Sequence, residues 1–464
     1  MAALVFHEQT GQAGSRRRPG AAAFRPRSLA ALKAVDGSKP LGAVVGIHAL
    51  GASRVDRVVR IPHRYAHLFV TRTLDGIEGE GSSQHAETAF ENSVFEALER
   101  TFATEYDPSA LVSGSYDSLR PKAVDPRELV LMSAWEHRQA PRGYVRFHSR
   151  LPLHWQRCWE ITSGGFRRRL VPATLSILRF SWSHPRERFA ATLSAGIASG
   201  PTYAGALLHA CYELVERDAF MLAWLRRNSC PVVPAPDFVD DQLTDSHRRL
   251  TQDGFEATFV DLTNDIGIPA FLTVIRLPDA RGRRGGFPAF GLGANLDPRK
   301  ALSRSYAEAL ELLVNHYDFS SPDTIRIRRV QSLRRGFRPR QYYEECRFLW
   351  AGTGTSDILR RNVPRFGGSW SELETCLAHL TSRDVRTYFV DLTPPGLRPA
   401  RYRLVRVLAT RLQPHLYELD SWRLDNPRLY PTVAGARRVD RRHGEAGLNL
   451  APNPYTVLEH VRLY

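Results

Sequence analysis

The sequence predicts a mixed α/β (α+β) fold, with sheets packed against helices and two loosely related halves. Two internal repetitions indicate this arrangement. The helix-forming sequence Glu-x-x-Glu-Arg occurs at Glu96–Arg100 and again at Glu213–Arg217. The strand-forming sequence Phe-Val-Asp-Leu-Thr occurs at Phe259–Thr263 and at Phe389–Thr393, and a turn that contains proline follows each copy. With 464 residues, of which 43% are hydrophobic, the chain is long enough to bury a sizeable core.

The first part of the chain predicts a tail followed by short strands. Residues 1 to about 40 are small, basic and interrupted by Gly and Pro without a sustained period, which is typical of a mobile tail. We therefore expect an N-terminal extension over residues 1–60 and a main domain over residues 61–464. Apolar runs predict strands at 43–47, 57–61 and 67–71, and then a helix that begins near Ala86.

The following segments alternate between strands and helices. Tryptophans are dispersed through the irregular stretch 120–188, and we expect them either to pack in the core or to form a wall against a peptide. Residues 270–276 and 286–291 predict a long hairpin around the arginine- and glycine-rich loop 279–286. The pair Asp297-Pro298 supplies an N-cap and a first-turn proline for the next helix.

The repeated glutamates suggest a metal-nucleotide site. Carboxylates three residues apart in a helix share a face, and an arginine four residues after the first lies one turn beyond it. Magnesium takes oxygen ligands from carboxylates and phosphates, and the arginine fork matches phosphate oxygens. The segment Arg304–Glu308 adds one more arginine and carboxylate on a third helix. The alternative is an ordinary exposed salt bridge, worth roughly 0.3–0.5 kcal/mol.

The second copy of the motif does not have the surroundings of a surface helix. Residues 206–208, 210–211, 214–215 and 219–221 are apolar, so this helix is expected to be buried. If the three helices converge, their arginines cannot neutralise all the glutamates, and bound cations would balance the excess. We expect metal ligation by Glu96, Glu99, Glu213, Glu216 and Glu308, and nucleotide binding by these five together with Arg100, Arg217 and Arg304.

Composition and motifs exclude several other classes. The net charge of +16 is strongly basic, but nothing resembles a DNA- or RNA-reading module, so no nucleic-acid partner is expected. The five cysteines form no Cys-x-x-Cys pair, which favours free thiols in a reducing cytosol. No apolar run approaches the ~20 residues of a membrane span, so we expect a cytoplasmic protein. There is no Gly-x-x-x-x-Gly-Lys-Ser/Thr, so any ATP site is of another design.

Several motifs together resemble the YcaO family. The segment Leu193–Ala219 contains Ser-x-Gly-x-Ala-x-Gly and then Glu-x-x-Glu-Arg-Asp, and Gly291–Pro298 leads into Arg304 and Glu308 as a further family block. The similarity runs from about Val70 to Pro454. It implies a YcaO-type fold and a protein that binds ATP and Mg²⁺ to activate backbone amides of peptides. The glutamates would hold magnesium against the triphosphate, and Arg217 and Arg304 would act catalytically on the transferring phosphoryl group.

The chain departs from the family pattern at several positions. Asn92 stands where the family usually has serine, and Gly205 stands where it usually has a metal-binding glutamate. Pro201 replaces a polar residue, and a lysine expected near Glu80 is missing. Either the site binds nucleotide with fewer ligands, or the protein is a catalytically impaired scaffold that docks a peptide or a partner.

The resemblance also implies a reaction and partners. The most direct expectation is cyclodehydration of Cys, Ser or Thr in a ribosomally made precursor peptide to azolines, with thioamide or amidine formation as alternatives. Azoline-forming members end in a proline-rich tail, which Ala451–Pro454 resembles, although ten further residues follow. Either ring formation needs a different proton acceptor, or residues 455–464 are an amphipathic end that packs on the core. We expect a leader-peptide-binding partner similar to ubiquitin-activating enzymes, a flavin dehydrogenase in the pathway, and a homodimer.

Overall fold

The computed structural model describes ten stretches of the chain. These are residues 54–139, 143–163, 165–278, 287–314, 317–319, 326–327, 339–398, 402–415, 422–430 and 448–450. The predicted tail, the predicted strand at 43–47, the loop 279–286 and the proline-containing end at 451–454 lie outside these residues. The predicted domain boundary after residue 60 falls at the end of strand β1 and stays a prediction.

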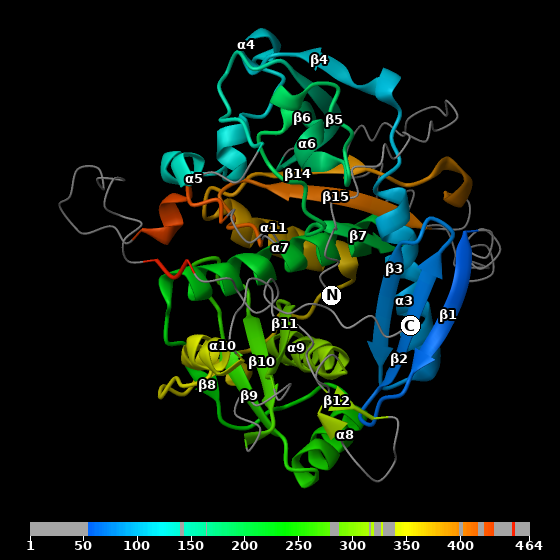
Figure 1. Ribbon diagram of the computed structural model, residues 1–464, viewed down its shortest axis with the longest axis vertical. Coiled ribbons are helices and arrows are strands. Elements are labelled where there is room, and N and C mark those ends of the chain that lie inside the picture. Colours follow the sequence, from blue (N-terminus) through cyan, green and yellow to red (C-terminus); the bar gives the residue numbers. More distant parts are fainter. Residues whose placement is uncertain are drawn as a thin grey trace.

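The first sheet is a three-stranded antiparallel meander covered by one helix. Strands β1 (Val55–Ile61), β2 (His67–Thr73) and β3 (Glu78–Ser83) pair in chain order, and α3 (Ala86–Phe102) covers one face (Figure 1). The predicted strands and helix start are confirmed. A Cβ atom at Gly79 or Gly81 would lie 2.2 Å from a backbone nitrogen of α3, so only glycine permits this close approach.

The second sheet repeats this arrangement with four strands. Its order is β11-β10-β9-β8, all antiparallel, and α9 packs against β10 and β11. The Asp297 side chain accepts a hydrogen bond from the Arg299 amide, so the predicted N-cap of α9 is confirmed. The bounds are β8 (Val232–Val233), β9 (Glu256–Asp261), β10 (Ala270–Arg276), β11 (Ala289–Ala294), α8 (Asp241–Gln252) and α9 (Pro298–Leu313).

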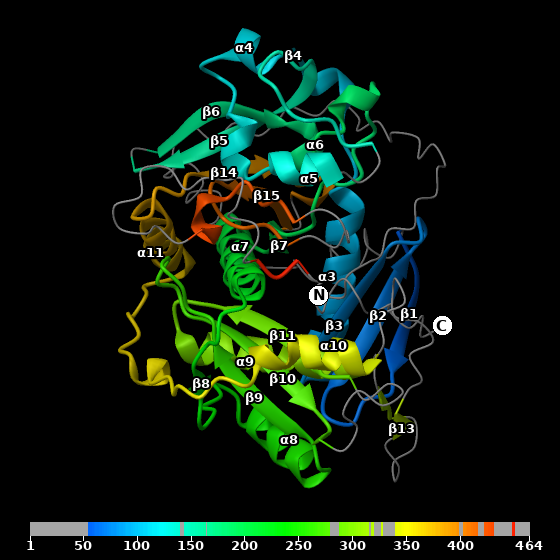
Figure 2. The same cartoon turned by 60° about the vertical axis from the view of Figure 1, so that its left-hand side comes forward.

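The third sheet joins strands that are far apart in the sequence. Its order is β4-β5-β14-β15-β7, with β6 paired to β5 outside this path. The long helix α7 lies between this sheet and the sheet that contains β11, and contacts both (Figures 1 and 2). The bounds are β4 (Val112–Gly114), β5 (Leu153–Thr162), β6 (Gly165–Pro172), β7 (Ile197–Gly200), α7 (Tyr203–Arg226), α11 (Ser369–Thr381), β14 (Thr387–Asp391) and β15 (Arg403–Ala409).

Short elements complete the described part of the chain. The short helices are α4 (Tyr116–Leu119), α5 (Ala134–Gln139), α6 (Ala173–Ser176) and α10 (Pro339–Cys346), and β12 (Tyr317–Asp318) pairs with β13 (Arg326–Ile327). The 3-10 helices are η1 (Pro108–Ala110), η2 (Pro126–Leu129), η3 (Pro185–Glu187), η6 (Arg347–Leu349), η7 (Ile358–Arg360), η8 (Pro395–Leu397) and η9 (Pro427–Leu429).

The two predicted halves are visible in matched hydrogen bonds. In the turn after β9, Asp261 Oδ1 accepts from the Thr263 amide and Thr263 Oγ1 accepts from the Ala270 amide. In the turn after β14, Asp391 Oδ1 accepts from the Thr393 amide, and Thr393 Oγ1 accepts from the Leu404 amide. Each Phe-Val-Asp-Leu-Thr strand therefore begins a hairpin whose second strand, β10 or β15, pairs with the strand before a glutamate helix.

The core confirms most of the packing expected for the aromatic residues. Trp155 is fully buried and Trp135 and Trp159 are partly buried against the core, whereas Trp182 is 41% exposed. All five cysteines are free thiols, as expected. Among the described residues, none of the helices combines the length and the apolar character that a membrane crossing requires.

Candidate functional site

Three strand-turn-helix units converge on one acidic cluster. Each helix begins after an N-cap residue, and the first glutamate of the motif follows that residue by eleven positions. The three N-cap and glutamate pairs are His85 and Glu96 on α3, Thr202 and Glu213 on α7, and Asp297 and Glu308 on α9. Equal spacing from the helix start gives the three glutamates the same position on their helices.

The first glutamate of each unit is fixed by the backbone of the preceding strand. The amide donors and carboxylate acceptors are Glu80 N to Glu96 Oε2 at 2.5 Å, Leu292 N to Glu308 Oε2 at 2.7 Å, and Gly196 N to Glu213 Oε2 at 2.9 Å. One oxygen of each carboxylate is thus held by the backbone. The other oxygen of Glu96 accepts from Arg100, and those of Glu213 and Glu308 lie 3.9 Å and 3.6 Å from Arg217 Nη2. This arrangement orients the carboxylates before any ligand binds.

Arg217 lies at the centre of the cluster. Its side chain is 2% exposed, and its Nη2 atom lies 3.3 Å from Glu216 Oε1, 3.6 Å from Glu308 Oε1 and 3.9 Å from Glu213 Oε1. The guanidinium therefore joins α7 to α9. The next residue, Asp218, is fully buried and accepts hydrogen bonds from the Arg428 guanidinium and the Gln413 amide, which fixes α7 in rotation.

The other two predicted cations have different surroundings. Arg304 Nε lies 4.0 Å from Glu216 Oε2, and its side chain is 45% exposed, so it reaches the edge of the cluster from solvent. Arg100 donates to Glu96 Oε1 at 2.6 Å and to the Glu78 carbonyl at 2.7 Å, within its own strand-helix unit. All eight predicted site residues therefore lie in or beside the cluster, and Arg100 is the most peripheral in its contacts.

The cluster is short of positive charge. Burial, then the neighbouring Glu213 and Glu96, raises the pKa of Glu99 to about 8, although the Ser199 amide donates to it. Burial also raises the pKa of Glu216 to about 7, with Glu308 adding to the effect and Arg217 opposing it. Carboxyl groups that resist ionisation at neutral pH are typical of a site that gains a cation with its ligand.

The residues present fit a hard metal ion held together with a nucleotide. Glu213 Oε1 and Glu216 Oε2 are buried oxygen atoms that accept no hydrogen bond. In the described stretches no three His, Cys, Asp or Glu side chains already have the spacing of ligands to one ion. Magnesium usually takes only one or two carboxylates and completes its shell with water and phosphate oxygens. An ion shared with phosphates fits this cluster better than an ion enclosed by protein alone.

Three charged residues of the cluster were missed by the sequence predictions. Glu80 lies on β3, and burial, then Glu311 and Glu96, raises its pKa to about 8. Glu311 lies on α9 with 8% exposure. Arg406 on β15 is buried, its guanidinium donates to the Leu193 and Leu175 carbonyls, and it interacts with Glu213. A signal existed for Glu311, because Glu308-Ala-Leu-Glu311 repeats the letters of Glu96-Ala-Leu-Glu99.

Two of the positions that depart from the family pattern lie on glutamate helices, Asn92 on α3 and Gly205 on α7. Asn92 is exposed, and its Nδ2 atom lies 3.5 Å from the Ser82 carbonyl. Gly205 lies in the first turn of α7, where its amide donates to the N-cap Thr202. A Cβ atom on Gly205 would have only Thr202 Oγ1 within 4 Å, at 3.2 Å, so the fold leaves room for a side chain there.

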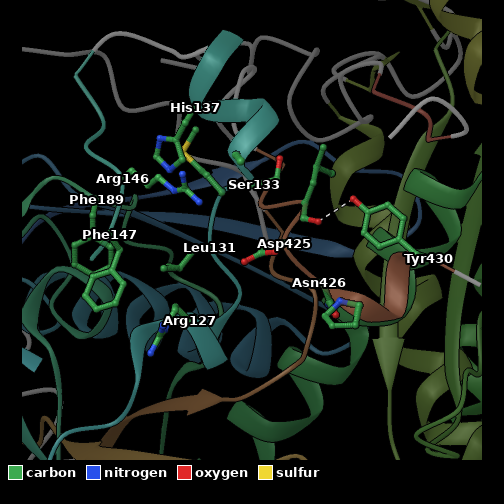
Figure 3. A pocket seen from close by; sticks show the side chains of 14 residues that line it. Arg127, Leu131, Ser133, His137, Arg146, Phe147, Phe189, Asp425, Asn426 and Tyr430 are labelled. Atoms are coloured by element: carbon green, nitrogen blue, oxygen red, sulfur yellow. Dashed lines mark hydrogen bonds between the residues drawn. The ribbon is translucent and has the colours of Figure 1, made fainter. Parts of the chain in front are cut away.

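A separate cavity of about 280 Å³ lies between α5 and the segment around η9. Its walls combine aromatic and cationic side chains, including Phe147, Phe189, Arg146 and His137, and Tyr430 donates to the Leu424 carbonyl at its edge (Figure 3). None of the clustered glutamates lines it. The chemistry suited to a metal-nucleotide therefore lies at the acidic cluster and not in this cavity.

Comparison with known proteins defines the class. The family model for YcaO cyclodehydratases, described as ATP- and Mg²⁺-binding, matches residues 80–413. The chain belongs to the YcaO family. The predicted family, its fold class and its cofactors, ATP and Mg²⁺, are confirmed.

Two relatives share recognisable sequence. An uncharacterized protein in the tfuA 3′ region of Rhizobium leguminosarum bv. trifolii is 32% identical over 351 residues, which are 74% of this chain and 77% of that protein. An uncharacterized protein of Methanothermobacter thermautotrophicus is 28% identical over 222 residues, 47% of this chain and 55% of that protein.

Solved structures share the fold at lower identity. A heterocyclase in complex with substrate and cofactor has a TM-score of 0.69 at 19% identity, over 90% of this chain and 58% of that one. A YcaO protein from Methanopyrus kandleri, bound with AMPPCP and Mg²⁺, has a TM-score of 0.60 at 17% identity, over 82% of this chain and 93% of that one. The chain thus spans less than two thirds of the length of the matched heterocyclase.

Proposed function

We propose that this protein uses ATP and Mg²⁺ to activate backbone amides of a ribosomally made precursor peptide, and that it cyclises Cys, Ser or Thr residues to azolines. The observation that carries this proposal is the convergence of glutamates from three helices around Arg217, with two buried carboxylate oxygens that accept no hydrogen bond. A structural salt bridge alone would not need this excess of carboxylates.

The clustered residues have distinct proposed roles. Glu96, Glu99, Glu213, Glu216 and Glu308 supply the carboxylates that hold Mg²⁺ ions, each ion being shared with phosphate oxygens of the nucleotide. Arg217, which is fixed by buried contacts, and Arg304, which reaches in from solvent, stabilise negative charge on the phosphoryl group in transfer. Arg100 orients Glu96 and binds nucleotide only at the edge of the site.

The proposed reaction requires ATP to remove the amide oxygen. An amide oxygen is a poor leaving group, and ATP, when bound, supplies the phosphoryl group that lets this oxygen leave as phosphate. The protein positions the peptide and the nucleotide and neutralises charge, because the substrate side chain is itself the nucleophile. The balance is one ATP hydrolysed to ADP and phosphate, and one ring formed, for each oxygen removed.

The names of the matched structures favour a peptide substrate and partner proteins. They include the heterocyclase TruD and the Escherichia coli microcin synthetase complex McbBCD with pro-MccB17 bound. We propose a cytoplasmic site of action. We also propose that a separate leader-binding protein delivers the precursor, because the described residues contain no obvious further recognition domain. A flavin dehydrogenase and a homodimer remain parts of the same proposal.

Mass spectrometry of a precursor peptide incubated with the protein, ATP and the leader-binding partner tests this function. The loss of one water per modified residue is expected for azolines, and replacement of oxygen by sulfur would indicate a thioamide instead. Unmodified precursor with unspent ATP would favour the scaffold alternative. Full modification without the partner would contradict only the proposed need for leader delivery.

A further inference from the structure

The third strand-helix unit carries a second carboxylate that the proposed site does not yet use. We infer that Glu311 is a metal-ligating residue of the Mg²⁺-nucleotide site, so that α9 contributes a pair of carboxylates, Glu308 and Glu311, as α3 and α7 do. This inference rests on the proposed function. It adds a residue to the ligand set and assigns the third helix an equal share in it.

The helices α3 and α9 pack against their strands in the same way. Thr71 Oγ1 and Ser93 Oγ lie 2.8 Å apart in the first unit, and Thr273 Oγ1 and Ser305 Oγ lie 2.8 Å apart in the third. Both serines follow their helix N-caps by eight residues and both donate to the carbonyl three residues earlier, Phe90 in α3 and Leu302 in α9.

Matched glycines fix the same geometry from the side of the strand. A Cβ atom on Gly79 or Gly81 would meet the backbone of α3, and one on Gly291 or Gly293 would meet the backbone of α9, each at 2.2 Å. The two helices therefore have the same rotation and the same distance over their strands. Glu311, which follows the N-cap by fourteen residues as Glu99 does, must leave α9 in the direction in which Glu99 leaves α3.

The surroundings of Glu311 point into the cluster. Its side chain is 8% exposed, and it accepts a hydrogen bond from the Ser82 side chain on β3, so it reaches from the third unit to the first. Glu96 and Glu308 are among its charged neighbours. A carboxylate this deep in a protein is stable only with compensating partners.

A second observation indicates a ligand at this place. Glu216, on α7, is 2% exposed, and its Oε2 atom accepts no hydrogen bond while the side chain faces Glu308 and Arg304. Within α9 the position after the pair is Leu312, where α3 has Arg100 and α7 has Arg217. The third pair is therefore not followed by an arginine, in contrast to the other two.

This ligand also explains how the site keeps its carboxylates with glycine at position 205. α7 contributes Glu213 and Glu216 to the cluster, and Glu311 adds a carboxylate from α9. The ligand set thus gains a carboxylate on α9 where α7 lacks one.

The test is Glu311→Gln in the full-length protein, with Glu87→Gln as matched control because Glu87 is an exposed glutamate on α3. Glutamine keeps the shape of the side chain and can still accept from Ser82. Binding of Mn²⁺ with a non-hydrolysable ATP analogue is followed by electron paramagnetic resonance. We expect a metal affinity about 10-fold weaker or more in Glu311→Gln, recovered at high metal concentration, and no change in the control.

Further variants separate this inference from the proposed function. Glu311→Asp should retain part of the affinity, because it keeps the charge, and thermal unfolding shows which fraction of each variant is folded. Wild-type affinity in folded Glu311→Gln, with affinity lost in Glu216→Gln, would overturn the inference and leave the proposed function standing. A wild-type protein that binds no metal-nucleotide would overturn both.

Discussion

Arg100 and Arg217 occupy the same position in two copies of one motif, but their surroundings differ. Arg100 is 12% exposed and pairs at 2.6 Å with Glu96 of its own helix. Arg217 is 2% exposed and lies 3.3–3.9 Å from three carboxylates on two helices. The same motif, Glu-x-x-Glu-Arg, therefore gives a local salt bridge in α3 and the centre of a candidate site in α7, and the difference comes from the sheets that enclose α7.

The largest effect should come from the two glutamates that share α7 with Arg217. Glu213→Gln and Glu216→Gln should each lower ATP consumption by about 100-fold or more, because each removes a charged oxygen from the metal shell. Loss of one like charge should leave the stability of the metal-free protein unchanged or higher. Phosphate release and thermal unfolding measure the two quantities. Full ATP consumption in either variant would contradict the magnesium role.

The two arginines should differ in their contribution to stability. Arg217→Met should lower the free energy of unfolding by about 3 kcal/mol, because it leaves several buried carboxylates without their shared cation. Arg100→Met should cost less, about 1 kcal/mol, because it removes one partly buried ion pair within its own helix. Urea denaturation of both variants measures the difference. Equal losses in the free energy of unfolding would show that Arg217 stabilises the fold no more than Arg100 does.

Gly205 offers a way to strengthen the α7 copy. Gly205→Glu places a carboxylate about two turns before Glu213 on the same side of the helix, and should tighten magnesium-nucleotide binding several-fold. Any side chain here also stabilises the helix by up to about 1 kcal/mol, and Glu or Gln completes a capping box with Thr202. Gly205→Gln is therefore the matched control. If Glu and Gln bind magnesium-nucleotide equally, the added carboxylate does not reach the metal.

The smallest effect concerns pH. Glu216 and Glu99, whose pKa values are raised by burial to about 7 and about 8, hold protons in the folded protein that the unfolded chain releases at its ordinary value of 4.5. The metal-free protein should therefore lose stability as pH rises from 6.5 to 8, by on the order of 1 kcal/mol in total. This pH window lies above the pH range in which His63 takes up or releases its proton, because burial lowers the pKa of His63 to about 4. Saturating Mg²⁺-nucleotide should flatten the slope, and a rise in stability over this window would contradict the assignment.

Local patterns were sufficient for the elements and for most of the cluster. The start of α3 and the Asp297 N-cap depend on neighbours in the sequence, and so do the spacings within each glutamate pair. Arg406 could not be predicted in this way, because it enters the cluster through β15, which pairs with the distant strand β7. Glu80 lies on β3, which pairs locally with β2, but its place in the cluster depends on how α3 packs over that strand. Glu311 was visible in principle, since its position relative to the N-cap repeats that of Glu99.

The grouping of the halves was only partly predictable. The repeated Phe-Val-Asp-Leu-Thr strands were recognised, but they combine with glutamate helices in a different chain order in each half. β10 pairs with β11, which follows it, whereas β15 pairs with β7, which precedes it by about 200 residues. Such pairing between distant strands leaves no local signal, so the sequence indicated related halves without showing how each is assembled.

Calorimetric titration of the purified protein with a non-hydrolysable ATP analogue, at several Mg²⁺ concentrations, tests the central claim most directly. The converging glutamates should give saturable binding that tightens as Mg²⁺ is raised and is lost in Glu216→Gln, while Glu87→Gln behaves as wild type. Absence of binding, or binding that does not depend on Mg²⁺, would contradict the claim that the cluster around Arg217 is a working metal-nucleotide site.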